Sequence, residues 1–423
     1  MLLPTVTLLL IGLFALNGLA APVAPDTVVA VINGRKVTAG ELDRVLSGAP
    51  PKLAENLKQN RKMFAENYAL LTMLREMAEK EGLAGKTPTR EQLEWSRMQV
   101  LMQAAIAERG AQQNKAGAAE SETGQDGLKK WLERNRSEIK VEIQNQGYFA
   151  TGNAGDESKP VAVVDGKPLT GAEAKRIMTG LPLAVRQKFQ TSPKDFLEQY
   201  ALMLRLVADA EAQKLQEKSP YKEQLDWVQS EQLMQGKLNA YSDSITVGLE
   251  DEKAYYQSHL DDYTEAKVKV LYISFADNPA QVPATDGRKP LNEKEAREKI
   301  EGLRKQLQEG ADFVKLVKEN SEDATSASKD GDLGVIRRSD KLPDHIKKAI
   351  FALKPGDVSE PVKQPNGFYL FKLEQMETKT LDAVRQDLLR DAKTQKFQEW
   401  FDTIRKSATV TYENDAYFSG QGK

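Results

Sequence analysis

The chain has 423 residues, too many for one ordinary hydrophobic core, and its 60 basic and 62 acidic residues leave a formal net charge of −2. These charges are interspersed, so no basic stretch indicates nucleic-acid binding. The absence of cysteine excludes disulfides and thiolate catalysis, and the presence of only His259 and His345 argues against a catalytic triad or a histidine-rich metal site. We therefore expect several domains and no cofactor, metal or nucleotide.

The N-terminal segment is almost wholly apolar from Leu2 to Leu19, and Gly18 and Ala20 give the small-x-small pattern that a signal peptidase reads. This pattern predicts a signal peptide over residues 1–20 that is removed from the mature protein. The alternative is an uncleaved membrane anchor, because about 18 apolar residues can span a bilayer. In both cases we expect the body of the protein in the periplasm or otherwise outside the cytoplasm.

An internal repeat follows. Three pairs of segments recur at one spacing of 132 residues: VAVINGRKVTAGEL from Val29 with VAVVDGKPLTGAEA from Val161, FAENYALL from Phe64 with FLEQYALM from Phe196, and EQLEW from Glu91 with EQLDW from Glu223. One register shared by three separate matches indicates homology. We predict two mainly helical, chaperone-type modules, over residues 28–150 and 160–264.

Each predicted module begins with a short apolar strand and a tight turn at Asn33-Gly34 or Asp165-Gly166, dipeptides that favour positive φ. Thr38 and Thr170 then stand where a helix N-cap is expected. The stretch Gly110–Gly127 lacks an apolar period and predicts a linker.

The last third of the chain begins with a predicted strand at Glu265–Phe275. Asn292 and Glu295 form a possible capping box for a helix that Gly310 would end. An amphipathic helix and a short strand are predicted over residues 380–413. The apolar stripe of this helix needs a partner, so we expect the helix to pack on the N-terminal modules.

Two long segments resemble the parvulin (PpiC-type rotamase) family of peptidyl-prolyl isomerases: GADFVKLVKENSEDATSASKDGDLG from Gly310 and IFALKPGDVSEPVKQPNGFYLFKL from Ile350. The resemblance implies a parvulin domain over residues 265–376, built as a small antiparallel sheet flanked by helices. Tandem helical modules before such a domain and a long helix after it resemble the SurA-type periplasmic foldases. The fold class that we expect is therefore α+β, with several domains.

An X-Pro bond isomerises across a barrier of about 18–20 kcal/mol without any bond being broken. The site must hold the proline ring in an apolar pocket and favour a twisted amide, whose nitrogen accepts hydrogen bonds better than a planar one does. Polar groups beside an apolar floor are sufficient for this chemistry.

The resemblance implies a catalytic set of Asp323, Tyr272 and Tyr369. The two tyrosines stand where the family has two facing histidines, and a tyrosine hydroxyl can both donate and accept a hydrogen bond. Asp323 falls on the family's Cys/Asp position, with a turn-capping role as the alternative. The implied substrate pocket consists of Leu342, Ile346 and Phe351, with core packing as the alternative for Phe351.

Three functions remain open. The first is a peptidyl-prolyl isomerase with attached chaperone modules that acts on unfolded or partly folded exported polypeptides. The second is a holdase whose parvulin domain is inactive, which the tyrosine replacements favour. The third is a structural subunit of an envelope assembly. None of them requires a nucleotide or a nucleic acid, and the expected membrane contact is limited to an uncleaved N-terminal segment.

Overall fold

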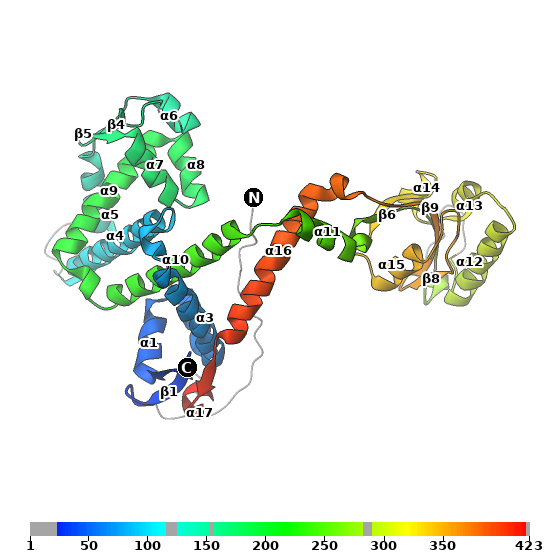
Figure 1. Ribbon diagram of the computed structural model, residues 1–423, viewed down its shortest axis with the longest axis horizontal. Helices are drawn as coiled ribbons and strands as arrows, with labels where there is room; N and C mark the ends of the chain where they lie inside the picture. Colours follow the sequence, from blue (N-terminus) through cyan, green and yellow to red (C-terminus); the bar gives the residue numbers. More distant parts are fainter. Residues whose placement is uncertain (1–22, 116–124, 153–154, 282–289, 420–423) are drawn as a thin grey trace. The chain divides into compact units, whose positions relative to one another are not determined.

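The structure, a computed structural model, describes residues 23–115, 125–152, 155–281 and 290–419. The described residues form two compact units (Figure 1): those up to residue 245 together with those from 397 on, and those between 246 and 396. The predicted signal peptide, residues 1–20, lies outside the described residues. Within the described parts of the chain, no helix combines the length and apolar character needed to cross a membrane.

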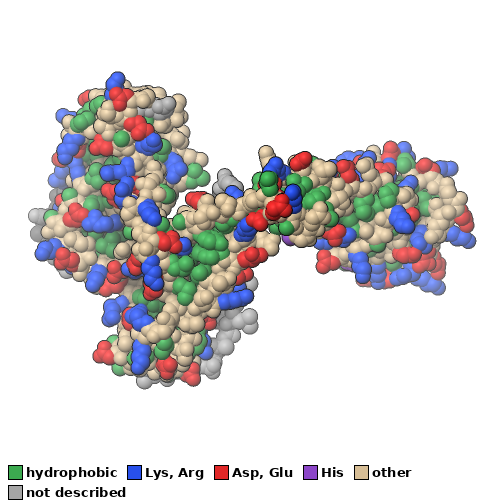
Figure 2. All heavy atoms as spheres, viewed as in Figure 1, with side chains coloured by type: hydrophobic (Ala, Val, Ile, Leu, Met, Phe, Trp, Pro, Cys, Tyr) green, Lys and Arg blue, Asp and Glu red, His purple; other side chains and the backbone are tan. Residues whose placement is uncertain are grey.

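The predicted fold class, α+β with several domains, is confirmed, because long helices surround three small antiparallel sheets. Figure 2 shows acidic and basic side chains interspersed over the visible face of each unit, as the balanced composition predicts.

The first unit contains two three-stranded antiparallel sheets, with strand orders β10-β1-β2 and β3-β4-β5. Their strands are β1 (Val28–Ile32), β2 (Arg35–Thr38), β3 (Val141–Ile143), β4 (Pro160–Val164), β5 (Lys167–Thr170) and β10 (Val410–Tyr412). Its helices are α1 (Ala39–Gly48), α2 (Pro51–Gln59), α3 (Arg61–Lys80), η1 (Leu83–Gly85), α4 (Thr89–Lys115), α5 (Gln125–Ser137), α6 (Gln146–Thr151), α7 (Gly171–Gly180), α8 (Leu183–Thr191), α9 (Pro193–Ala212), η2 (Leu215–Glu217), α10 (Tyr221–Ser244), α17 (Asp415–Ser419) and the end of α16 (Leu381–Ser407).

The predicted turns and caps are confirmed. Asn33 and Asp165 have φ values of 49° and 50°, and the glycine after each also has positive φ. The hydroxyls of Thr38 and Thr170 accept hydrogen bonds from the third backbone amides of α1 and α7. The predicted linker at Gly110–Gly127 is partly wrong: α4 continues to Lys115 and α5 begins at Gln125, because alanine and glutamine are good helix formers despite the missing apolar period.

The elements from β1 to α4 recur in the same order from β4 to α10, each 132 residues later. The two copies exchange their long helices. Helix α4 packs on α7 and α9 of the second copy, and α10 packs on α1 and α3 of the first copy. A Cβ atom at Gly48 would lie 2.1 Å from the carbonyl oxygen of Glu223, and one at Gly180 would lie 2.5 Å from that of Glu91. Glycine is therefore required at both equivalent crossings.

A second repeat, which the sequence analysis missed, relates α5-β3-α6 to the end of α16, β10 and α17 at a spacing of 269 residues. Its matched pairs are Trp131 with Trp400, Arg136 with Arg405, Val141 with Val410, Asn145 with Asn414, Tyr148 with Tyr417, and Phe149 with Phe418. Strand β3 pairs with β4, and β10 pairs with β1. Each copy of the 132-residue repeat is thus completed by one copy of this shorter arm.

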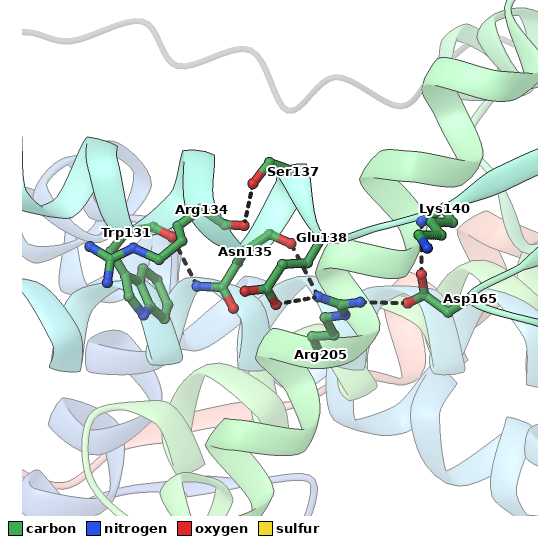
Figure 3. Close-up of polar contacts among 8 residues, drawn as sticks. All are labelled: Trp131, Arg134, Asn135, Ser137, Glu138, Lys140, Asp165 and Arg205. Carbon is green, nitrogen blue, oxygen red and sulfur yellow. Dashed lines mark hydrogen bonds and ion pairs between the residues drawn. The ribbon is translucent and has the colours of Figure 1, made fainter.

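The two arms are anchored by equivalent contacts. The backbone amide of Lys140 donates to Asp165 Oδ1 over 2.9 Å, and that of Thr409 donates to Asn33 Oδ1 over 3.0 Å. Figure 3 shows the first anchor, where Arg205 pairs with the other carboxylate oxygen of Asp165 at 2.7 Å and also binds the carbonyl oxygen of Asn135. The C-terminal helix, predicted to pack on the N-terminal modules, does so at its end, where the ring centroid of Trp400 in α16 lies 3.9 Å from that of Tyr241 in α10.

The arms also close the two apolar cores of the first unit. Tyr148 and Phe149 are buried in one core, where the ring of Phe149 lies 5.2 Å from that of Phe189. Tyr417 and Phe418 are buried in the equivalent positions of the other core.

The second unit is built on one four-stranded antiparallel sheet of order β7-β6-β9-β8. Its elements are α11 (Leu249–Ser258), η3 (Leu260–Tyr263), β6 (Thr264–Ser274), η4 (Pro279–Gln281), α12 (Glu293–Gln308), α13 (Phe313–Asn320), α14 (Ala324–Ala327), β7 (Asp332–Arg337), α15 (Asp344–Phe351), β8 (Val362–Gln364), β9 (Gly367–Thr378) and the start of α16. Side chains of α12 and α13 pack in one apolar cluster, and those of α15 in another, each with alternate residues of β6 and β9. The predicted strand at Glu265–Phe275 and the predicted capping box of α12 at Asn292 are confirmed.

Candidate functional site

The two tyrosines predicted for the site lie directly opposite each other on the central strands of the second unit. Tyr272 of β6 and Tyr369 of β9 are paired in register, and their ring centroids are 4.4 Å apart with 30° between the ring planes. The hydroxyl of Tyr272 donates a hydrogen bond of 2.7 Å to the carbonyl oxygen of Asn366, in the turn before β9. The register of the β6–β9 pair therefore brings the two predicted residues into contact.

The ring of Tyr272 is held over a glycine. A Cβ atom at Gly367 would lie 2.2 Å from a ring carbon of Tyr272 and 2.6 Å from the carbonyl oxygen of Ile273. No side chain fits this space without displacing the tyrosine or the strand. The Asn366-Gly367 turn, which the sequence analysis did not include in the site, thus fixes the position of Tyr272.

Both tyrosine hydroxyls are protonated at neutral pH. Burial, followed by the nearby Tyr369, Glu322 and Asp323, raises the pKa of Tyr272 to about 12. Burial and then Asp323 raise the pKa of Tyr369. Among the described residues, the Tyr369 hydroxyl makes no hydrogen bond, whereas that of Tyr272 is already donated. Tyr369 is therefore the hydroxyl that remains able to donate to a ligand.

Asp323 is the N-cap residue of the short helix α14. Its carboxylate accepts a hydrogen bond of 3.2 Å from the amide of Thr325 and one of 2.6 Å from the hydroxyl of Ser326. The capping alternative for Asp323 is therefore seen. Its charge also lies close enough to both tyrosines to raise the pKa of each hydroxyl. A direct catalytic role for Asp323 stays a prediction.

The three predicted pocket residues meet beside Tyr369. Leu342 and Ile346 are partly buried and pack with Phe351 and Tyr369 in one apolar cluster. Phe351 is only 9% exposed, and the guanidinium carbon of Arg338 lies 4.5 Å from the centroid of its ring. Leu342, Ile346 and Tyr369 thus belong to one partly buried apolar cluster, and Phe351 lies in its buried part, as the core alternative expects.

A second polar group that the sequence analysis missed borders the tyrosines. Glu322 accepts hydrogen bonds from the backbone amide and the hydroxyl of Ser274, and its own amide donates to the carbonyl oxygen of Tyr272 over 2.9 Å. Ser326, which binds Asp323, is 3% exposed. The motif S-E-D-A-T-S-A was the available signal, but it does not show that Glu322, in the loop between α13 and α14, binds β6.

The histidines do not contribute to this tyrosine site. His259 stacks on Tyr255 with ring centroids 4.0 Å apart, and His345 lies against the amide of Gln364. Within the described residues, no group of three or more histidine and acidic side chains is placed to hold a metal ion. The arrangement offers a neutral hydroxyl beside an apolar surface, which is the chemistry that an X-Pro bond requires.

Comparison with known proteins supports this interpretation of the second unit. Residues 282–375 match the family described as "Rotamase: PPIC-type PPIASE domain". The chain contains a PPIC-type rotamase domain. The match includes Asp323, Tyr369 and the three pocket residues, while Tyr272 precedes it. The resemblance predicted from the sequence is thereby confirmed for the rotamase domain.

Relatives of known name share parts of the chain. It is 38% identical over 125 residues to "Chaperone SurA" of Thiobacillus denitrificans, and the match covers 28% of this chain and 28% of that protein. It is 28% identical over 268 residues to "Putative peptidyl-prolyl cis-trans isomerase Cbf2" of Campylobacter jejuni, which covers 60% of this chain and 92% of the relative. It is also 28% identical over 185 residues to "Foldase protein PrsA" of Caldanaerobacter subterraneus, over 43% of this chain and 53% of that protein.

The SurA relatives are matched over less than a third of their length. Among solved structures, one described as "The virulence factor PEB4 and the periplasmic protein Cj1289 are two structurally-related SurA-like chaperones in the human pathogen Campylobacter jejuni" is 24% identical, with a TM-score of 0.29. That similarity covers 60% of this chain and 100% of the other. By sequence, parts of this chain thus resemble proteins named as a SurA chaperone, a PrsA foldase and a putative peptidyl-prolyl isomerase.

Proposed function

We propose that this chain is an exported chaperone whose rotamase domain isomerises X-Pro bonds in unfolded client polypeptides. The observation that carries the proposal is the Tyr369 hydroxyl, which is protonated, makes no hydrogen bond among the described residues and borders the apolar cluster of Leu342, Ile346 and Phe351. The apolar residues N-terminal to residue 21 and the names of the relatives support export and a chaperone role.

The proposed mechanism breaks no covalent bond. The proline ring packs on Leu342 and Ile346, and rotation about the C–N bond removes its amide resonance. The imide nitrogen then accepts a hydrogen bond from Tyr369, which stabilises the twisted state more than the planar ground state. Asp323 acts on the two tyrosines through its charge, since it raises the pKa of both.

A second candidate is a binding domain without catalysis. The Tyr272 hydroxyl is already donated to Asn366, Phe351 is almost fully buried and the Asp323 carboxylate caps α14. Three of the six predicted site residues are thus engaged inside the domain. In this case the domain holds proline-containing segments and the helical unit prevents their aggregation.

Exchange NMR on short X-Pro peptides decides between the two candidates, using the chain without residues 1–20. We expect the wild type to accelerate exchange and Tyr369→Phe to lose about tenfold of that acceleration, the effect of one lost hydrogen bond. Tyr272→Phe is the matched control, because its hydroxyl is donated within the domain, and it should retain most of the activity. Exchange at the uncatalysed rate, together with suppressed aggregation of an unfolded client, would establish the binding domain instead.

A further inference from the structure

A small pocket lies in the first unit, where the exchanged helix α4 crosses α7 and α9. It is small and partly open to solvent, and its lining includes Glu91, Trp95, Arg176 and Tyr200. It consists of residues far from the rotamase domain in sequence and is not used in the mechanism above.

Glu91 is a buried carboxylate with one unused oxygen. The residue is 4% exposed, and its Oε1 atom accepts hydrogen bonds from Arg90 Nε at 3.0 Å and from Thr87 Oγ1 at 3.2 Å. Its Oε2 atom has no hydrogen-bond partner among the described residues. Burial raises the pKa of Glu91, but hydrogen bonds from Arg90, its own backbone and Thr87 outweigh it and leave the pKa lowered. The pocket therefore contains an ionised acceptor, and leaving a buried acceptor unpaired is costly.

An unpaired donor lies on the same wall. Trp95 Nε1 is buried and has no hydrogen-bond partner among the described residues. The indole stacks on Tyr200 with ring centroids 6.5 Å apart and 9° between the planes. Burial is the largest cause that raises the pKa of Tyr200. The nearby, exposed Glu94 raises this pKa further, and Arg176 lowers it. The pocket thus combines flat aromatic walls with two carboxylates and one guanidinium.

The same residue types recur 132 positions along the repeat. Glu91, Glu94, Trp95, Arg176 and Tyr200 correspond to Glu223, Asp226, Trp227, Arg44 and Tyr68. Glu223 Oε2 is also buried without a hydrogen bond among the described residues, whereas Trp227 Nε1 lies close enough to Glu231 to lower the pKa that burial raises for that carboxyl. The nearest atoms at Gly180 and Gly48 are backbone atoms of Glu91, Glu223 and Gln224 and one side-chain carbon of Glu91. These contacts do not explain why both carboxylates keep an unused oxygen.

We propose that the Glu91–Trp95 pocket binds a cationic side chain, the guanidinium of arginine or the ammonium of lysine, from a bound polypeptide. The cation donates to Glu91 Oε2, and its aliphatic stem lies on the rings of Trp95 and Tyr200, where aromatic faces attract positive charge. The indole N–H of Trp95 donates to a carbonyl oxygen of the same polypeptide. Arg90 already binds Oε1, so what the cation adds is a charged donor for Oε2, and an apolar side chain of the same length would leave that oxygen without a hydrogen bond. This proposal is independent of isomerase activity.

The test uses the indole N–H signals of the whole chain without residues 1–20. The four tryptophans give four signals, and Trp95→Phe identifies that of Trp95. Titration with acetyl-Gly-Ala-Arg-Ala-Gly-amide should shift the Trp95 signal saturably, whereas the peptide with norleucine in place of arginine should not. A Trp95 signal that stays fixed at millimolar peptide would mean that the pocket holds only water, and equal shifts with both peptides would mean that it selects no charge. Either result overturns the proposal.

Calorimetric titration with the arginine peptide measures the role of the carboxylate. Glu91→Gln should weaken binding at least about tenfold, because it removes the charge but keeps the shape. Glu211→Gln is the matched control: it removes an acid of α9 that pairs with Arg97 of α4 at 2.6 Å outside the pocket, and it should bind as the wild type does. Trp95→Phe keeps the aromatic stack without the N–H and should also weaken binding. Unchanged affinity in both pocket variants would refute the assignment.

Discussion

At the scale of single residues, the candidate site depends on which tyrosine hydroxyl is free. The sequence treats Tyr272 and Tyr369 alike, since each occupies a position that the family fills with histidine. The structure separates them, because Tyr272 donates to Asn366 and Tyr369 does not donate to any described residue. Sequence reasoning could name the pair but could not assign the two roles, which depend on a turn carbonyl with no side-chain signal.

The protonation of Tyr272 makes stability depend on alkaline pH. Its pKa is about 12 in the folded protein, above the ordinary value of about 10 in an unfolded chain, so folding favours the neutral form. The stability that this contributes is complete below pH 10 and is lost as the pH rises from about 10 to about 12.

We expect the free energy of unfolding to fall more steeply over that window in the wild type than in Tyr272→Phe, which has no group to ionise. Urea unfolding followed by circular dichroism at several pH values measures both slopes. Tyr255→Phe provides a control tyrosine of the same unit with a smaller pKa rise. Parallel slopes in the wild type and Tyr272→Phe would contradict the assigned burial of the hydroxyl.

At the scale of elements, strand β9 is positioned by its first residue. Gly367 leaves room for the Tyr272 ring, and a methyl group there would overlap both the ring and the backbone of β6. We expect Gly367→Ala to destabilise the rotamase domain by about 2–3 kcal/mol, in the range of overpacked sites. Gly302→Ala is the matched control, because it lies in helix α12 with open space around the added carbon and should stabilise by about 0.5–1 kcal/mol.

Hydrogen exchange of the β9 amides, followed by mass spectrometry, measures the effect of both glycine substitutions locally. This probe is needed because all four tryptophans, at positions 95, 131, 227 and 400, lie in the first unit. Protection in Gly367→Ala equal to that of the wild type would show that β9 tolerates the side chain.

Elements with strong local signals were predicted well. The Asn-Gly and Asp-Gly turns, the Thr38 and Thr170 caps and the capping box of α12 all follow from short-range chemistry and are present. The continuation of α4 through an alanine- and glutamine-rich stretch was missed, because a helix end without apolar residues resembles a linker. The second repeat was missed because only six residues are identical between its two copies, and these residues are scattered along each copy.

At the scale of the whole molecule, the division of the sequence into modules 28–150 and 160–264 stays a prediction about homology. The hydrophobic cores of the first unit do not follow this division, because each contains elements of both copies. Each core joins strands and short helices of one copy to a long helix of the other. Sequence periodicity could show that α4 and α10 have apolar faces. It could not show which copy each helix covers, because the two copies present equivalent surfaces.

The two arms should contribute equally to the stability of the first unit. Phe149 and Phe418 are 1% and 8% exposed in equivalent cores. We expect Phe149→Ala and Phe418→Ala each to lower the free energy of unfolding by about 3–5 kcal/mol. Leu183→Ala, at a residue 63% exposed on α8, should have almost no effect.

Tryptophan fluorescence during urea unfolding measures these three variants, since it reports on the first unit alone. A wild-type midpoint in Phe418→Ala would show that the C-terminal arm does not belong to the core, whatever the effect of Phe149→Ala.

The pairing of β1 with β10 also sets the order of events during synthesis. Val31 near the start of the chain is paired with Thr411, and the core around Val29 is closed by Tyr417 and Phe418. The strand that pairs with β1 is therefore synthesised long after it, and β1 keeps an open edge until then. This core therefore reaches its final packing only after Phe418 has been synthesised.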